Sequence, residues 1–381
     1  MRYIHQLDEW PGFWWDDSKV IDMLAQVCSA QGRILGYMQS VGFELCSATE
    51  LDALTAEILK SSEIEGEILD LGQVRSSLAR YLGINIGGLA EASRHIDGIV
   101  EMTLDATKKY EEPLTEQRLF AWHNCLFPAG TSGLRKLKPG QWRQDESGPM
   151  CVVSGSYGKE RVHFEAPIAE RVPNEISTFL NWFNDNNDIN AILKAAVAHL
   201  WFVTIHPFDD GNGRIARAVA DMQLARSDQS PMRFYSMSAQ IRKERIEYYD
   251  ILEKTQKSKK IYNASIDITG WICWFLKCLL SALENTDTLL SRVLKKAEFW
   301  SSKAADEFNE RQRLMINKLF DGFTGKLTAQ KWAKITKCSH DTALRDITQL
   351  IKKSILIKDP SGGRNTSYSF RNDSESIRKG V

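Results

Sequence analysis

The sequence predicts a mainly α-helical fold with a small β-hairpin and a C-terminal winged helix-turn-helix. Apolar residues recur at helical spacing through most of residues 49–319. The alternation typical of strands is confined almost entirely to residues 151–164 and 321–381. With 381 residues, the chain is long enough for two or three domains, each with its own core.

The helices are expected at residues 49–82, 89–108, 115–126 and, with loops between them, from Asn174 to about Leu319. An aromatic segment at the N-terminus is followed by a further helical pattern, and together they are expected to cap the next helices. Glycine and proline interrupt any regular pattern between Pro128 and Pro149, so a loop is expected there.

Composition excludes several classes of protein. The formal net charge is zero, so the molecule as a whole is not a polyelectrolyte that binds by charge alone. The seven cysteines are scattered and form no CxxC pair, which indicates a reduced, intracellular protein without a disulfide framework or zinc site. The N-terminus lacks a signal-like apolar run, and the most apolar segment is too short to span a bilayer. We therefore expect a cytoplasmic protein.

The most informative segment is residues 206–217, which read HPFDDGNGRIAR. Helical patterns precede and follow it, and the proline at 207 predicts that the first helix stops near His206. The segment is therefore a tight loop that ends at the N-terminus of a helix, where backbone N–H groups lack partners and the helix dipole is positive. Gly211 and Gly213 allow these N–H groups to converge on one point, and phosphate is the expected occupant.

Each polar side chain of this loop has an expected role in a site that binds phosphate. His206, with an ordinary pKa near 6.5, fits a general base. Asp210 offers the oxygen ligand that Mg²⁺ prefers, and Asn212 with the neighbouring N–H groups can hold the phosphoryl group under attack. Arg214 and Arg217 share one helix face and can hold the remaining phosphates. The alternating oxygen ligands of a calcium loop are absent, and the sequence contains no P-loop.

At every fixed position the segment is similar to the signature of the Fic-domain family, His-x-Phe-x-(Asp/Glu)-Gly-Asn-Gly-Arg-x-x-Arg. The resemblance implies a helical core and an enzyme that transfers AMP from ATP to a Ser, Thr or Tyr hydroxyl of a protein. It implies that His206 deprotonates the hydroxyl and that Asp210 holds Mg²⁺. It also implies that Asn212 steadies the α-phosphate and that Arg214 and Arg217 hold the β- and γ-phosphates.

The hairpin predicted at 151–164, with its turn at Gly155–Gly158, matches the position of the family's docking flap. Exposed strand edges of this kind can bind an extended peptide, although a plain connecting hairpin has the same pattern. The residues expected to form the target-docking surface are Val152, Val153, Val162 and His163.

A second resemblance lies upstream. The family's regulatory motif, (Ser/Thr)-x-x-x-Glu-(Gly/Asn), is matched by Ser61, Glu65 and Gly66, and on a helix Ser61 and Glu65 share a face. The resemblance implies that Glu65 pairs with Arg217 and that ATP then binds unproductively. An Arg–carboxylate pair is strong enough to compete with a phosphate. The chain would thus be inhibited by its own N-terminal helix.

The adenine site is less well defined by sequence. Tyr249 falls where family members line the adenine pocket, whereas Gln256 replaces the asparagine often found there. His199 is expected to be a satisfied core residue rather than a ligand.

The C-terminal region changes in character. Residues 327–334 and 339–353 resemble a helix-turn-helix, and 355–358 and 367–370 have the pattern of a two-stranded wing. Between Lys326 and Arg371 there are ten Lys and Arg against three Asp, which favours DNA as a partner. Modules of this kind also serve in dimerisation or protein contacts, so a homodimer is equally compatible with the pattern.

The expected organisation is an N-terminal helical region with the inhibitory helix (1–88), a Fic core (89–285), a connecting helix (286–320) and a winged-helix-like domain (321–381). The expected activity is protein adenylyltransfer with ATP and Mg²⁺, with a target protein or the chain itself as acceptor. The same residues also fit the reverse reaction, removal of AMP from a modified protein. A DNA-binding regulator with a nucleotide-sensing core is the alternative from another class.

Overall fold

The computed structural model describes residues 2–40, 43–84, 91–133, 135–145, 148–155, 161–185, 188–303, 306–320, 323, 325–359 and 366–371. It divides into two compact units, Met1–Asp287 and Thr288–Val381. Each unit has its own core and is described by itself. Among the helices in these described ranges, none is long and apolar enough to cross a membrane.

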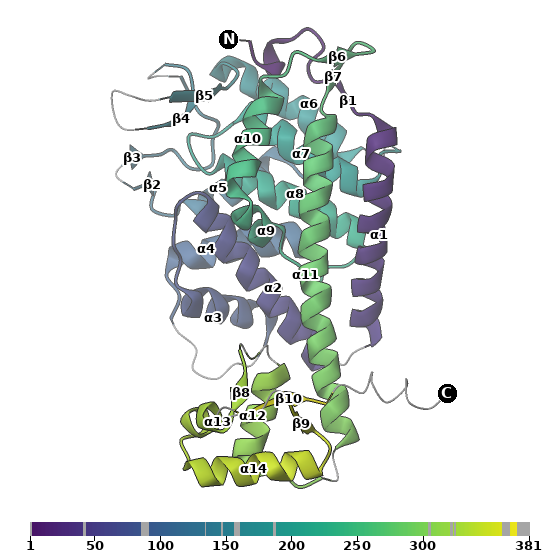
Figure 1. Cartoon of the computed structure of the whole chain (residues 1–381). Coiled ribbons are helices and arrows are strands. Elements are labelled where there is room, and N and C mark those ends of the chain that lie inside the picture. The colour runs from purple at the N-terminus through teal and green to yellow at the C-terminus, as the bar shows by residue number, and fades with distance from the viewer. Residues whose placement is uncertain are drawn as a thin grey trace. The chain divides into compact units, whose positions relative to one another are not determined.

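The first unit is a helical bundle (Figure 1). Its helices are α1 (Asp17–Ser40), α2 (Phe43–Ile64), α3 (Leu71–Leu82), α4 (Arg94–Lys108), α5 (Glu116–Leu126), α6 (Val172–Asn184), α7 (Ala191–Ile205), α8 (Asn212–Asp228), α9 (Met237–Lys243), α10 (Arg245–Gln256) and the first half of α11 (Thr269–Ser302). Helices α7 and α8 are the most extensively packed pair. Every residue of α7 from Ile192 to Ile205 is buried, because its sequence is apolar on all faces.

Helix ends follow local signals more closely than the sequence pattern predicted. The expected helix over 49–82 is two helices, because Gly66 has a φ of 87° and Asp70 caps α3 by accepting from the N–H of Gln73. Helix α4 begins at Arg94, after its N-cap Ser93; residues 89 and 90, the first of the expected 89–108 helix, lie outside the described ranges. The break after α2 is the segment that carries Glu65.

The described residues of the first unit form three small sheets. The predicted hairpin is present as the antiparallel pair β4 (Cys151–Ser154) and β5 (Arg161–Glu165); its turn, including 156–158, lies outside the described residues. Two other sheets were not predicted, namely β2 (Thr131–Ser132) with β3 (Arg135–Lys136), and β1 (Phe13–Trp14) with β7 (Ser265–Asp267) and β6 (Ile261–Tyr262). Strands of two or three residues are too short to show a period, and the parallel β1–β7 pair joins distant parts of the chain.

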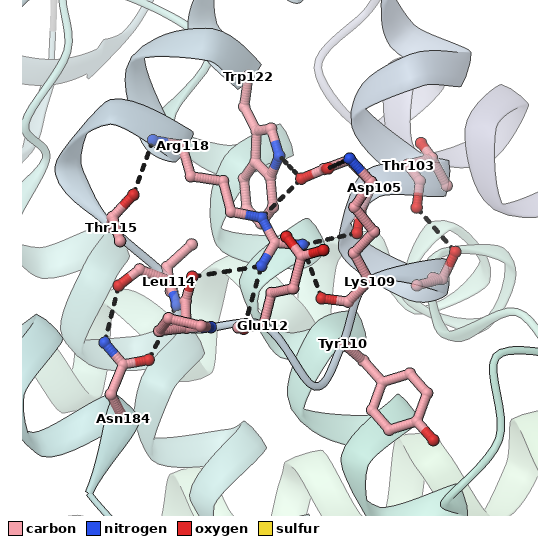
Figure 2. Close-up of polar contacts among 12 residues, drawn as sticks. Thr103, Asp105, Lys109, Tyr110, Glu112, Leu114, Thr115, Arg118, Trp122 and Asn184 are labelled. Carbon is pink, nitrogen blue, oxygen red and sulfur yellow. Dashed lines mark hydrogen bonds and ion pairs between the residues drawn. The ribbon is translucent and has the colours of Figure 1, made fainter.

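Arg118 makes most of the side-chain contacts shown for the connection between α4 and α5 (Figure 2). Arg118 donates from Nε to the Asp105 carboxylate at 2.6 Å and from Nη2 to the Asp105 and Lys109 carbonyls at 2.7 and 2.9 Å. The Trp122 indole donates to the same carboxylate at 2.7 Å. From α8, Arg226 donates to the Tyr110 carbonyl at 2.8 Å. These contacts hold α5 in place, and the end of α5 lies beneath the loop that carries the motif.

The second unit contains the end of α11, helices α12 (Glu310–Phe320), α13 (Ala329–Thr336) and α14 (His340–Lys352), and strands β8 (Leu327–Thr328), β9 (Leu356–Lys358) and β10 (Ser367–Phe370). The strands form an antiparallel sheet in the order β8-β10-β9. The core of the second unit contains Met315, Trp332, Ile347 and Leu350. This element order is the one expected of a winged helix; the assignment stays a prediction, and the wing turn at 360–365 lies outside the described residues.

The four-part division expected from the sequence (1–88, 89–285, 286–320 and 321–381) also stays a prediction. The structure separates its two units after Asp287. Helix α12 falls within the expected connecting segment, yet Met315 and Ile316 on it are fully buried in the core of the second unit.

Candidate active site

The loop from His206 to Gly211 joins α7 to α8 and is held by its own phenylalanine. Helix α7 stops at Ile205, as the proline at 207 predicts; His206 itself is left-handed, and Gly211 precedes α8 with a φ of 81°. Phe208 is fully buried, and its ring stacks on that of His123 with 4.2 Å between ring centroids. Trp142 lies 5.0 Å from the same ring. The Phe208 side chain therefore anchors the loop in the core.

The Asn212 side chain closes the loop rather than facing a ligand. Its Oδ1 accepts from the Phe208 N–H at 2.9 Å, and its Nδ2 donates to the Phe208 carbonyl at 2.8 Å. The side chain is 2% exposed. The sequence-based expectation that Asn212 holds the phosphoryl group thus shifts to its backbone N–H, which belongs to the first turn of α8, where N–H groups lack intrahelical partners.

The two glycines of the motif are required for different reasons. At Gly211 the left-handed backbone disfavours any side chain, and a Cβ would lie 2.9 Å from the Phe127 ring and 3.0 Å from Leu126. At Gly213 a Cβ would lie 2.2 Å from Oε1 of Glu65. Glycine at 213 is therefore what allows the Glu65 carboxylate to lie directly against the first turn of α8.

His206 is oriented for proton transfer. Its Nδ1 lies 3.2 Å from the Val203 carbonyl, so Nδ1 carries the proton and Nε2 is the basic atom. From outside the loop, Arg143 donates from Nε to the His206 carbonyl at 2.7 Å and from its backbone N–H to the Pro207 carbonyl at 2.9 Å. Burial lowers the pKa of His206 to about 4, despite the opposing effect of the Val203 carbonyl. The imidazole is thus neutral at pH 7, with a pKa well below the ordinary value assumed from sequence.

Asp210 is partly buried beside the helix terminus. One of its oxygens accepts from the Gly211 N–H at 2.6 Å, and the other accepts from the hydroxyl of Ser132 on β2. No cluster of three potential metal-ligating side chains occurs in the described part of the chain. A single carboxylate fits Mg²⁺, which is commonly held by one or two carboxylates together with substrate phosphates and water.

Arg217 is held by the end of α2. Its Nη2 lies 2.8 Å from Oε1 of Glu65 and 2.9 Å from the Ser61 carbonyl, and its Nε donates to the Ser61 hydroxyl at 2.9 Å. The ion pair implied by the sequence resemblance is therefore present. Arg217 is 3% exposed, and within the described ranges its Nη1 is buried without a hydrogen-bond partner. The guanidinium thus keeps an unused donor next to Gly213, 3.3 Å from the position that a Cβ there would take.

Arg214 is held by a second carboxylate that sequence reasoning missed. Its Nη1 lies 2.9 Å from Oε2 of Glu67, and the other oxygen of Glu67 lies 2.5 Å from Nε2 of His95 on α4. The hydrogen bond from His95 is the main reason that the pKa of Glu67 is lowered. Arg214 also lies over the Phe127 ring, 5.1 Å from its centroid. The only sequence signal was a pair of acids on either side of Gly66.

Tyr249 and Gln256 lie on α10. The Tyr249 hydroxyl donates to the Ile64 carbonyl at 3.4 Å, so this ring touches the end of α2 beside Glu65. Gln256 is buried and donates to the Thr204 hydroxyl at 3.2 Å. Placement of adenine against Tyr249 stays a prediction. His199 is fully buried and lies 3.0 Å from the Tyr248 hydroxyl, as expected of a satisfied core residue.

The four predicted flap residues divide into two pairs. Val153 and Val162 face each other across β4 and β5 and are 49% and 46% exposed. Val152 instead packs on the cluster formed by Tyr3, Phe164 and Ala166. His163 anchors the hairpin, because its Nδ1 lies 2.6 Å from a carboxylate oxygen of Glu253 on α10.

A polar pocket of about 410 Å³ lies between the start of the hairpin and the motif loop. Lys136 and Lys138 line it on one side, Cys151 on another, and Trp142 and Asp209 on the side of the loop.

The fold and the site are similar to those of Fic-domain proteins. The model of the Fic/DOC family matches residues 113–224, a range that holds the motif loop, both arginines and the hairpin, and the chain carries a domain of that family. Residues 3–84 match a domain of unknown function (DUF4172), and this range includes Ser61 and Glu65.

Among curated proteins, the chain is 31% identical over 109 residues to a probable protein adenylyltransferase of Aquifex aeolicus, covering 28% of this chain and 34% of that protein. It is 38% identical over 171 residues to the protein adenylyltransferase fic-1 of Caenorhabditis elegans, covering 44% and 31%. The chain thus spans about one third of the length of these relatives. A Fic family protein from Desulfovibrio desulfuricans shares the fold with a TM-score of 0.50 at 20% identity, covering 92% of this chain and 95% of that one.

Proposed function

We propose that this protein is an adenylyltransferase that moves AMP from ATP to a side-chain hydroxyl of a protein. The observation that carries the proposal is the position of a neutral His206 beside the N-terminus of α8, with the buried Arg214 and Arg217 in the first two turns of that helix. That arrangement supplies a base and fixed positive charge at one place, which is what transfer of a phosphoryl group requires. The adenylyltransferase relatives support the same reaction.

In the proposed reaction the acceptor hydroxyl oxygen attacks the α-phosphorus of ATP. The bond between the α-phosphorus and the bridging oxygen to the β-phosphate breaks, and pyrophosphate leaves. Nε2 of His206 takes the hydroxyl proton, while Nδ1 stays bonded to the Val203 carbonyl. The N–H groups of the first turn of α8 hold the α-phosphate, and Arg214 and Arg217 neutralise the pyrophosphate. Asp210 would hold Mg²⁺, which would supply additional positive charge to the phosphates.

The acceptor segment is proposed to bind along the β4–β5 hairpin. Val153 and Val162 form an exposed apolar pair there, and an extended peptide can bond to the adjacent strand edge. The polar pocket beside Asp209 would receive the side chains nearest to the acceptor hydroxyl. Glu253 holds the hairpin against α10 through His163, so the docking strand keeps a fixed distance from the base.

We further propose that the resting chain is inhibited by Glu65. Its carboxylate neutralises Arg217 and occupies the space above Gly213, where a terminal phosphate would otherwise lie. A carboxylate and a phosphate compete for the same guanidinium, so nucleotide must displace Glu65 to bind productively. Glu67 acts in the same direction, because it holds Arg214 in an equivalent way.

The test uses ATP labelled at the α-phosphate, with Mg²⁺, and follows label on protein. The E65A variant is expected to label itself, and the double variant E65A/H206A is expected to lose at least 99% of that label. Label on E65A/H206A equal to that on E65A would refute the role of His206. Release of label from prelabelled protein, with no net incorporation by any variant, would instead favour the reverse reaction.

A further inference from the structure

The two units differ strongly in charge, although the whole chain is neutral. Residues 288–381 carry 19 Lys and Arg against ten Asp and Glu, whereas residues 1–287 carry 30 against 39. The second unit is therefore a basic body joined to an acidic one. Charge asymmetry of this kind points to a polyanionic partner for the basic part.

The basic unit contains two helices joined by a tight turn. Helix α13 ends at Lys337, which is left-handed with a φ of 52°, and Ser339 caps α14 by accepting from the N–H of Thr342 at 3.2 Å. Trp332 of α13 and Ala343 of α14 are both fully buried in the shared core. The turn thus fixes α14 against α13, as in a helix-turn-helix.

One face of α14 is left free by this packing. Its buried face holds Ala343, Ile347 and Leu350, which recur every three or four residues. The opposite face is exposed and holds Asp341, Arg345, Thr348 and Lys352. Gln349 is exposed as well, but its Oε1 accepts from the Gln312 amide at 2.8 Å. Arginine, lysine and threonine are residue types that bond base edges in the major groove.

The acids of this region are mostly used inside the unit. Asp346 is buried on α14 and pairs with Arg311 at 2.7 Å. Asp359 accepts the hydroxyls of Ser367 and Ser369 at 2.6 and 2.8 Å. The surrounding cations remain exposed, namely Lys326, Lys331, Lys334, Lys337, Lys358 and Arg371. Of the acids between 326 and 359, Asp341 alone is exposed, so the net field of this surface is positive.

We propose that the second unit binds duplex DNA, with the exposed face of α14 in the major groove. The groove is about 12 Å wide and accepts one α-helix. The polar stripe of α14 would contact the bases, while the exposed lysines of α13 and the flanking strands would contact phosphates. This activity is separate from the proposed adenylyl transfer and requires none of the residues of the first unit.

The test measures binding of the full-length protein to a fluorescein-labelled random-sequence DNA duplex of about 30 base pairs by anisotropy, at several KCl concentrations. We expect binding that weakens steeply as salt rises, because each phosphate contact releases counterion. The variant R345A/K352A is expected to raise Kd at least tenfold and to flatten the plot of log Kd against log salt. The matched control K259A/K260A removes two exposed cations from the first unit and is expected to leave Kd unchanged.

Three results would overturn the proposal. They are no binding at the lowest salt concentration, equal Kd for wild type and R345A/K352A, and tighter binding to an RNA duplex of the same sequence than to DNA. A loss of affinity in K259A/K260A equal to that in R345A/K352A would mean that DNA responds to the overall charge of the protein and not to the exposed face of α14. Adenylyl transfer by E65A, measured on the same preparation, shows that a failure here leaves the proposed activity of the first unit intact.

Discussion

Oε1 of Glu65 lies 2.8 Å from Nη2 of Arg217, and the same oxygen lies 2.2 Å from the position that a Cβ at residue 213 would take. The Glu65 carboxylate therefore does two things: it neutralises Arg217, the last arginine of the motif, and it covers the first turn of α8. Ser61, one helical turn earlier, accepts from the same guanidinium through its hydroxyl and its carbonyl. In the proposed mechanism, nucleotide binding and the end of α2 are coupled through one side chain.

The Glu67 contact gives a prediction about partial release. The variant E67Q keeps the shape of the side chain but removes its charge from Arg214. Glu67 is one third exposed, so its pair with Arg214 is worth only about 0.5–1 kcal/mol. We expect E67Q to bind ATP two- to fivefold more tightly than wild type, measured by calorimetry. The variant E63A, which alters an acid of α2 paired with Lys60 and Arg242, serves as the control and should bind ATP as wild type does.

The closure of the loop by Asn212 predicts a loss of both stability and rate. N212A removes two hydrogen bonds and leaves the buried N–H and carbonyl of Phe208 without these partners. The expected cost is about 2–3 kcal/mol of unfolding free energy, measured by urea denaturation. In the E65A background the labelling rate should fall at least 100-fold, because the α8 terminus loses its fixed position. An unchanged free energy of unfolding would mean that the two Asn212–Phe208 hydrogen bonds do not stabilise the loop.

Gly211 and Gly36 form a matched pair for backbone strain. In G211A the new Cβ meets Phe127 and Leu126 at a left-handed position, so unfolding free energy should fall by about 2 kcal/mol or more. In G36A the Cβ of a residue within α1 meets no atom within 4 Å, and stability should rise by roughly 0.5–1 kcal/mol. Equal effects of the two substitutions in thermal unfolding would contradict the strained geometry assigned to Gly211.

The lowered pKa of His206 predicts an unusual pH profile. A base acts when it is deprotonated, so the rate is lost only as pH falls through the pKa of about 4, rather than through the ordinary value near 6.5. The labelling rate of E65A should therefore be flat between pH 8 and pH 5.5. A rate that halves near pH 6.5, while circular dichroism shows the protein still folded, would mean that the imidazole is less buried than the structure indicates.

The parts of the site that could be predicted from sequence are local. The stop at His206 follows from the adjacent proline, and the phosphate-binding terminus follows from Gly211 and the start of α8. The pairing of Glu65 with Arg217 joins residues far apart in the chain, and only the family resemblance pointed to it. The hairpin was visible because its strands alternate over four or five residues.

Contacts that depend on the packing of distant segments were not visible. Arg143 reaches the His206 carbonyl across 63 residues, and Ser132 reaches Asp210 across 78. His95 holds Glu67 from another helix. None of these residues is part of a recognisable sequence motif. The two-residue strands around Ser132 are too short to show the alternating pattern of a strand. The sequence suggested the proposed reacting groups, whereas the groups that hold them in place could be seen only in the packed structure.

In the proposed mechanism, activity depends on whether Glu65 or a phosphate group of ATP occupies Arg217. The most direct measurement is the initial rate of label incorporation from α-labelled ATP for wild type, E65A and E63A under identical conditions. We predict that E65A labels at least tenfold faster than wild type and that E63A labels at the wild-type rate. Equal rates for E65A and wild type would contradict the account.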